Sequence, residues 1–194
     1  LMQVNKSKIR IGLIGLGQMG RNHLRVLSLL KGVEIQFIYD LDYANSKEMA
    51  QVFDVPAIEN VNGVWPSVDA AIICSPTSTH SSMLRIASKH VSNIFVEKPL
   101  SYSLESTRSD VEYIKKNNLS IQVGFIERFN PAVQKMKSVI DQSERVINLD
   151  FTRTNKISAR IKDVDVITDL MVHDIDLAIH LNGSVKIVKA QGIA

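Results

Sequence analysis

The sequence contains a single cysteine, Cys74, among 194 residues. A disulfide bond needs two thiols, so the chain can form no internal disulfide. The same scarcity excludes a metal cluster built on several cysteine thiolates.

Charge of one sign is also scarce. The formal net charge is only +3, and the lysines and arginines are interspersed with acidic residues. Nucleic-acid-binding proteins usually carry a basic stripe or patch, so this pattern argues against nucleic acid as a partner.

Long apolar runs are missing as well. None approaches the roughly 18 residues that a membrane span requires. The polar start "LMQVNKSK" lacks the apolar core of a signal peptide. We therefore expect a cytoplasmic protein with no membrane partner.

The residues that are present, 45% hydrophobic and 22% charged, have the composition of a globular protein with a core. Apolar runs of strand length alternate with segments of helical period. The strand-like runs are 8–14, 33–40, 68–75, 92–97 and 120–126, and the helical segments are 19–31, 43–53, 79–90 and 103–117. This alternation predicts an α/β fold of the Rossmann type, a doubly wound parallel sheet with helices on both faces.

The pattern changes after residue 126, where a second domain begins. The predicted elements are a helix from Pro131, a strand at 145–154, a helix at 166–182 and a last strand at 185–193. We therefore expect a first domain over residues 1–123 and an incomplete α+β open-sheet domain over residues 124–194.

The segment "GLIGLGQMGRNHL" carries the first specific chemistry. Gly15, Gly17 and Gly20 form G-x-G-x-x-G directly after a predicted strand and at the start of a predicted helix. The second strand ends at Asp40, whose carboxylate can accept both hydroxyls of an adenosine ribose. Glycines also mark ordinary turns, but this context predicts a dinucleotide site with the pyrophosphate at the helix N-terminus.

The residues after Asp40 bear on which dinucleotide binds. They are Leu41 and Asp42, with no arginine to bind a 2′-phosphate. The sequence therefore favours NAD over NADP as the cofactor.

Two further strand ends reach the same predicted edge of the sheet. The first carries "CSPTSTH" at 74–80, which an ordinary proline turn with a threonine helix cap would also explain. The second carries "EKP" at 97–99, where the proline restricts the backbone of the preceding lysine. We expect Lys98 to project at the ligand edge, although an ordinary surface lysine would give the same sequence. The predicted cofactor contacts are Gly15, Gly17, Gln18, Met19, Gly20, Asp40, Ser75, Pro76, Thr77, His80, Glu97 and Lys98.

The segment "DLMVHDIDLAIH" at 169–180 has helical spacing and many polar residues. On an ideal α-helix Asp169, His173, Asp176 and His180 share one narrow arc, and apolar residues cover most of the rest. We expect an enclosed helix whose polar strip lines a cleft, although a solvated face would give the same strip. Asp174 falls among the apolar residues, so it needs hydrogen bonds or a cation.

These motifs together resemble a known family. G-x-G-x-x-G at 15–20, EKP at 97–99 and aspartate-x-x-x-histidine at 169–173 are similar to the glucose-fructose oxidoreductase, inositol dehydrogenase and MocA family. The resemblance covers almost the whole chain, and it implies that Lys98, Asp169 and His173 are catalytic. "GFIERFNPAV" at 124–133 most resembles the members that oxidise the C3 hydroxyl of UDP-N-acetylglucosamine.

The implied activity is oxidation of a sugar or nucleotide-sugar hydroxyl by hydride transfer to NAD. In this reading His173 is the base, Asp169 orients its imidazole, and Lys98 stabilises the developing alkoxide. Asp169 and His173 also lie one helical turn apart, as metal ligands do, but the redox motifs need no metal, and we expect none.

A substrate diphosphate would find cations in the second domain. Arg128, Asn130, Arg153 and Arg160, with Lys156, are the candidate substrate residues, although an exposed basic loop would predict the same set.

Chains that resemble this family are usually longer, so we also expect a C-terminal truncation. An alternative function follows from this, a catalytically inactive dinucleotide-binding or scaffold protein. Strands at 145–154 and 185–193 would leave unpaired edges, which predicts a homo-oligomer.

Overall fold

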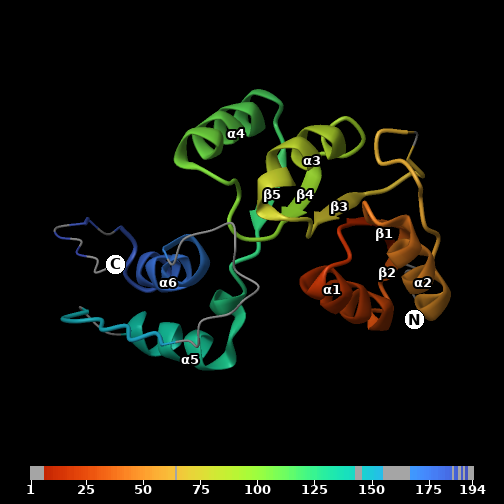
Figure 1. The fold of residues 1–194 in the computed structure, drawn as a ribbon. Coiled ribbons are helices and arrows are strands. Elements are labelled where there is room, and N and C mark those ends of the chain that lie inside the picture. The colour runs from red at the N-terminus through yellow and green to blue at the C-terminus, as the bar shows by residue number, and fades with distance from the viewer. Residues whose placement is uncertain are drawn as a thin grey trace. The chain divides into compact units, whose positions relative to one another are not determined.

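The computed structural model describes residues 7–63, 65–142, 146–154, 167–184, 186, 187, 189 and 191, and it leaves out the side chains of residues 168 and 169. Contacts between residues divide the chain into two units, Leu1–Gly124 and Phe125–Ala194. Each unit is described by itself, and Figure 1 follows the chain through both.

The first unit is built on a parallel five-stranded sheet with strand order β2-β1-β3-β4-β5. The strands are β1 (Ile9–Ile14), β2 (Val33–Tyr39), β3 (Ala70–Ile73), β4 (Asn93–Val96) and β5 (Ser120–Val123). The order reverses between β1 and β3, which is where ligands bind in open α/β sheets. The predicted Rossmann fold is confirmed.

Four helices connect these strands. They are α1 (Gln18–Leu29), α2 (Tyr43–Phe53), α3 (His80–Ala87), which follows a short 3₁₀ turn at Thr77–Thr79, and α4 (Leu104–Lys116). Local capping explains where two of them begin. The Asp42 side chain accepts hydrogen bonds from the first-turn N–H groups of α2, and Ser103 with Ser106 forms a capping box at α4.

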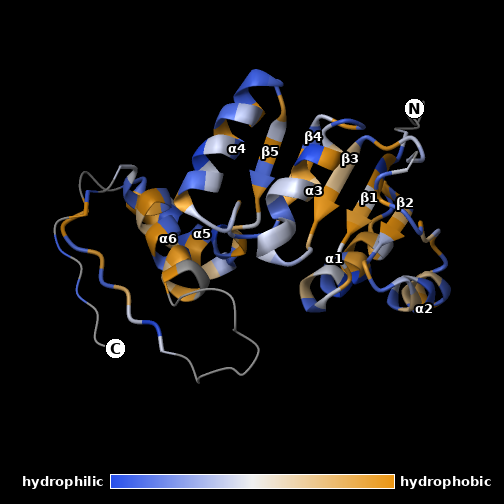
Figure 2. Ribbon diagram, turned by 45° about the horizontal axis from the view of Figure 1, so that its top comes forward, coloured by the Kyte–Doolittle hydropathy of each residue, from blue (hydrophilic) through white to orange (hydrophobic). Residues whose placement is uncertain are grey.

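Two buried clusters lie on opposite faces of the sheet. The neighbours Leu13 and Ile14 belong to different clusters, because successive side chains of a strand point to opposite faces. Leu24 of α1 packs in the Leu13 cluster and Leu84 of α3 in the Ile14 cluster, so helices cover both faces. Figure 2 shows β1 and β3 coloured as hydrophobic, as strands buried on both faces should be. Full burial of a side chain such as Leu13 contributes about 1.5–3 kcal/mol relative to its exposure.

The second unit contains a 3₁₀ turn (Ile126–Phe129), α5 (Pro131–Ile140), a π-helical turn (Ile167–Met171) and α6 (Val172–Asn182). Asn130 caps α5 through the N–H of Ala132, and Pro131 occupies the first helical position, where its missing N–H does no harm. A small core joins Val133 of α5 to Leu177 and Leu181 of α6.

Three expectations for the second unit were wrong. No strand occurs within the described residues of 145–154, because a strand persists only beside a partner strand, and the described part of this unit has none. Most of the predicted strand at 185–193 lies outside the described residues. The helix at 166–182 is not enclosed: Met171, Ile175 and Ile179 are 47%, 38% and 43% exposed. Residues 167–171 form a π-helical turn, so the ideal α-helical wheel does not hold between Asp169 and His173.

Among the residues that the structure describes, no helix combines the length and the apolar character needed to cross a membrane.

Candidate functional site

A hollow of about 840 Å³ lies at the carboxyl ends of β1, β2 and β3. It is lined by Ile14, Gly15, Gly17, Gln18, Met19, Tyr39, Asp40, Leu41, Asp42, Cys74, Ser75, Pro76, Thr79 and Met83. The structure thus brings together seven predicted cofactor residues: Gly15, Gly17, Gln18, Met19, Asp40, Ser75 and Pro76.

Each glycine of the motif meets a different steric requirement. Gly15 has φ +92°, and a Cβ there would lie 2.4 Å from the backbone nitrogen of Ser75. A Cβ on Gly20 would lie 1.8 Å from the carbonyl oxygen of Gly15, so only glycine lets α1 start this close to β1. A Cβ on Gly17 would meet no atom within 4 Å, so this residue faces the open space of the hollow. The loop therefore leaves room for a group to approach its backbone.

The N-terminus of α1 fits an anionic group. Gly17 is the N-cap residue, and among the described residues no side chain caps this helix. First-turn N–H groups of a helix carry partial positive charge and bind phosphates readily. Glycine backbone, open space and an uncapped helix end together fit the pyrophosphate of a dinucleotide.

Asp40 is held at the end of β2 by two backbone N–H groups. Its Oδ2 accepts a hydrogen bond from Leu16 N–H at 2.6 Å, and its Oδ1 accepts one from Asp42 N–H at 3.0 Å. A carboxylate offers about four acceptor positions. Asp40 can therefore keep both bonds and still accept the hydroxyls of a ribose.

Arg21, which the sequence analysis did not identify, lies near this carboxylate. Arg21 of α1 donates to the Leu16 carbonyl at 3.1 Å and to Asn45 Oδ1 at 2.6 Å. Neither of the two residues directly after Asp40 is an arginine, but the fold brings Arg21 to Leu16, the residue whose N–H donates to Asp40. The bond to Asn45 holds its guanidinium group against α2.

The "CSPTSTH" segment divides between the hollow and the interior. Ser75 and Pro76 line the hollow, and so does Thr79, which was not among the predicted cofactor contacts. Thr77 is not among the lining residues. His80 is 1% exposed and lies beneath the loop, where its ring contacts the backbone carbonyls of Ser75 and Pro99.

Glu97 of the "EKP" segment also turns inward. Its side chain is buried, with Oε1 2.7 Å from Nε2 of His23 on α1 and Oε2 3.1 Å from the backbone nitrogen of Lys98. A Cβ on Gly124 would lie 2.9 Å from Oε2, so a glycine there makes room for the carboxylate. Glu97 therefore holds the backbone of Lys98 rather than lining the hollow.

Lys98 itself is partly buried at the end of β4, and its peptide bond to Pro99 is cis. Its position after β4 places it at the carboxyl edge, the edge that also carries the hollow.

A possible metal-ligand group occurs next to Glu97. Ligand atoms of His23, Cys74 and Glu97 lie within 4.8 Å of one another. Burial, with the nearby charge of Glu97, raises the pKa of the Cys74 thiol far above its ordinary value, so the thiol stays protonated. Both Glu97 oxygens are already hydrogen-bonded. The group therefore does not fit a thiolate metal site.

In the second unit, two predicted substrate arginines bind carboxylates of α6. Arg128 donates to Asp176 at 2.8 and 2.5 Å, and Arg153 donates to Asp174 at 2.8 and 3.0 Å. These hydrogen bonds raise the pKa of both guanidinium groups. The expected cation beside Asp174 is thus Arg153.

The structure describes only some of the remaining predicted site residues. Asn130 serves as the cap of α5, and His173 lies in the first turn of α6. Arg160, Lys156 and the side chain of Asp169 lie outside the described residues.

Sequence reasoning missed several lining residues of the hollow. Tyr39 and Leu41 directly flank Asp40, and Asp42 lies two residues after it, so their place at a strand end was a signal that could have found them. Met83 lies one turn into α3, and nothing local marks it as a lining residue.

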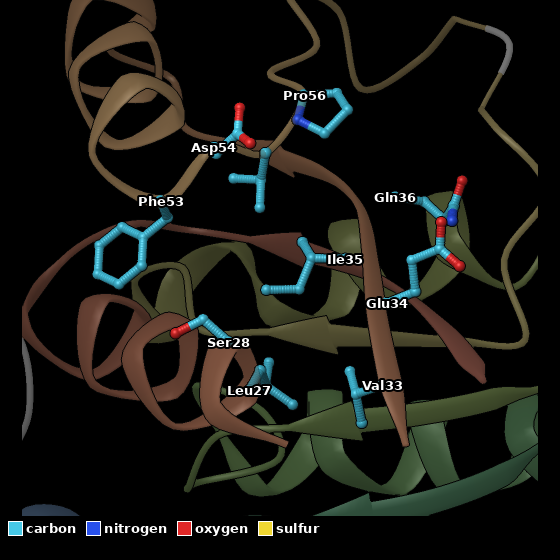
Figure 3. A pocket seen from close by; sticks show the side chains of 10 residues that line it. Leu27, Ser28, Val33, Glu34, Ile35, Gln36, Phe53, Asp54 and Pro56 are labelled. Carbon is cyan, nitrogen blue, oxygen red and sulfur yellow. The ribbon is translucent and has the colours of Figure 1, made fainter. Parts of the chain in front are cut away.

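A second hollow of about 330 Å³ lies elsewhere on the first unit. Figure 3 shows its labelled lining residues: Leu27 and Ser28 of α1, Val33, Glu34, Ile35 and Gln36 of β2, Phe53 of α2, and Asp54 and Pro56 beyond it. These β2 residues belong to the amino-terminal half of the strand. The hollow therefore does not belong to the carboxyl edge where Asp40 lies.

Comparison with known proteins agrees with this geometry. A family described as "Oxidoreductase family, NAD-binding Rossmann fold" matches residues 9–125. The chain is 32% identical to scyllo-inositol 2-dehydrogenase (NAD(+)) of Bacillus subtilis, over 91% of this chain and 55% of that one. It is 29% identical to UDP-N-acetylglucosamine 3-dehydrogenase of Acidithiobacillus ferrooxidans, over 96% of this chain and 58% of that one.

Solved structures show the same likeness. A crystal form of the UDP-N-acetylglucosamine 3-dehydrogenase of A. ferrooxidans matches with a TM-score of 0.77 and 27% identity, over 91% of this chain and 57% of that one. Scyllo-inositol dehydrogenase of Lactobacillus casei, solved with NAD(H) and scyllo-inositol, matches with a TM-score of 0.66 and 25% identity, over 70% of this chain and 42% of that one.

The chain spans 55–58% of the length of the two curated relatives named above. The match over residues 9–125 nevertheless covers the whole sheet, the glycine motif, Asp40 and the "EKP" segment. The chain belongs to the glucose-fructose oxidoreductase, inositol dehydrogenase and MocA family of NAD-binding oxidoreductases.

Proposed function

We propose that this chain carries the cofactor domain and the catalytic side chains of an NAD-dependent dehydrogenase that oxidises a ring hydroxyl of a sugar or cyclic polyol. The observation that carries the proposal is the hollow that joins Gly15, Asp40 and Ser75, with Lys98 at the same edge of the sheet. A nicotinamide cofactor supplies the hydride acceptor.

The chain's own residues supply the proton chemistry. Oxidation of a hydroxyl removes a proton from oxygen and a hydride from carbon, so a base has to lie at the oxygen. His173 takes this proton, and Asp169, four residues earlier in the sequence, orients its ring. The Lys98 ammonium group stabilises the negative charge that develops on the oxygen.

The ion pairs of α6 favour an uncharged polyol as the substrate. Asp176 holds Arg128 through two hydrogen bonds, and Asp174 holds Arg153. A substrate diphosphate would have to compete with these carboxylates for the same donors. Two of the relatives are named as dehydrogenases of scyllo-inositol, which is an uncharged polyol.

A nucleotide sugar is the second candidate. It is supported by the relative named UDP-N-acetylglucosamine 3-dehydrogenase, which aligns over 96% of this chain. For this substrate, Arg128 or Arg153 would exchange its carboxylate for a phosphate oxygen.

The test is to measure NAD binding by calorimetry and NADH formation by absorbance with inositols, free sugars and UDP-N-acetylhexosamines. We expect NAD binding and turnover with a ring polyol, and loss of turnover in Lys98→Met. Turnover confined to the nucleotide sugars would favour the second candidate. NAD binding without turnover on any substrate would instead indicate a binding protein.

A further inference from the structure

His80 is a buried side chain at the end of the segment 74–80, four residues of which line the hollow. It is the first residue of α3 and is 1% exposed. Its ring is therefore removed from solvent, and its two nitrogens depend on protein groups for hydrogen bonds.

Both ring nitrogens face backbone carbonyl oxygens. Nδ1 lies 2.8 Å from the oxygen of Pro99, and Nε2 lies 2.9 Å from the oxygen of Ser75. A carbonyl oxygen only accepts hydrogen bonds, and a neutral imidazole has only one N–H to donate. Both contacts are hydrogen bonds only if both nitrogens carry a proton. In the neutral form one nitrogen lone pair would face a carbonyl oxygen inside the protein.

Two buried carboxylates belong to the segments that His80 connects. Asp110 of α4 is buried and accepts hydrogen bonds from Ser81, next to His80, and from Ser101, two residues after Pro99. Glu97, also buried, precedes Pro99 by two residues.

Two cations belong to the same elements. Arg85 of α3 pairs with Asp110, and Lys98 precedes Pro99. The two carbonyl contacts define the hydrogen-bonding role of the ring, because each of them requires a donor from it.

We propose that both ring nitrogens of His80 donate hydrogen bonds in the folded protein, and that His80 acts as a positioning residue that ties the Ser75–Pro76 turn to the Lys98–Pro99 segment. Ser75 and Pro76 line the cofactor hollow. Glu97 accepts the N–H of Lys98, and His80 donates to the carbonyl of Pro99, so the lysine is held on both sides. The importance of this for catalysis rests on the proposed function.

The protonation state is tested directly by ¹⁵N NMR of the ring nitrogens in the full chain labelled with ¹⁵N-histidine, at neutral pH and without cofactor. His80→Gln assigns the His80 signals. We expect both His80 nitrogens in the range of protonated imidazole nitrogens. A His80 signal in the range of an unprotonated nitrogen would overturn the proposal.

The positioning role is tested by NAD affinity in three variants. His80→Gln keeps one donor and His80→Leu keeps none, so we expect affinity to fall by about threefold and tenfold, in the order of lost donors. His90→Gln is the control, because His90 is exposed and stacks on Trp65. Circular dichroism checks that each variant folds, and a folded His80→Leu variant with parent affinity would refute the positioning role.

These readouts separate the inference from the proposed function. Neither the ring signals nor NAD binding requires turnover, so a parent protein that forms no NADH would contradict the proposed function alone. Failure of the ¹⁵N signature would contradict the His80 inference even in an active enzyme.

Discussion

Glu97 lies at the end of β4 and His23 lies on α1, yet the carboxylate Oε1 and the imidazole Nε2 are 2.7 Å apart. The other carboxylate oxygen accepts the N–H of Lys98. One buried side chain therefore connects the helix that begins at the glycine motif to the backbone of the candidate catalytic lysine.

Removal of His23 should destabilise the first unit. His23→Ala leaves a buried carboxylate oxygen without its donor, and we expect a loss of about 1–3 kcal/mol in the free energy of unfolding. His23→Gln can donate from its amide and should recover part of the loss. Urea unfolding measures both variants, and equal stability of His23→Ala and the parent would show that the contact contributes nothing.

Gly124 should tolerate no side chain. A Cβ there would lie 2.9 Å from both Glu97 Oε2 and the Phe95 ring, so Gly124→Ala should destabilise by about 1–3 kcal/mol through overpacking. Gly32→Ala is the matched control, because a Cβ at Gly32 meets no atom within 4 Å. Comparable urea midpoints for the two variants would contradict this reading of the site.

The carboxylate of Asp40 should determine cofactor preference. We expect NAD to bind more tightly than NADP, because the negative charge of Asp40 repels a 2′-phosphate. Asp40→Ala should reduce the difference between the NAD and NADP affinities, mainly because NAD binds more weakly to the variant. Calorimetric titration of both cofactors measures this, and equal or reversed affinities in the parent would refute it. Arg21→Ala tests whether the nearby guanidinium group contributes to residual NADP binding.

The kinetic prediction concerns His173 and depends on the proposed function. General-base catalysis typically contributes about 10² to 10⁴ in rate, so His173→Asn should lower kcat on that scale with little change in NAD affinity. His180→Asn, about two turns further along α6, should have a much smaller effect. Near-parent turnover of His173→Asn would assign the base to another group.

Self-association is expected from the exposed apolar residues of α6. Ile175 and Ile179 of α6 lie four residues apart, so they share one face of the helix, and both are exposed, as is Met171, the residue directly before the helix. Light scattering should give a mass above that of the 21.6 kDa chain, and Ile175→Asp with Ile179→Asp should lower it. A parent protein that stays monomeric at high concentration would count against the oligomer.

The sequence by itself determined the Rossmann fold and the core of the cofactor hollow. Strand and helix periodicities are local properties of the chain, and they recur in each strand and helix from β1 to β5. Gly15, Gly17 and Asp40, which line the hollow, and Gly20, which lets α1 start close to β1, were identified for the same reason, because each meets a local steric or chemical requirement of the turn between a strand and a helix.

Only the tertiary structure decided which way the side chains at those strand ends turn. His80 and Glu97 stand in motifs that predict cofactor contact, yet they face inward, because Pro99 and His23 offer partners from distant parts of the chain. The partners of the α6 carboxylates are likewise arginines 21 and 48 residues away. The segment at 145–154 forms no strand in its described residues, because pairing depends on a neighbour that local sequence cannot supply.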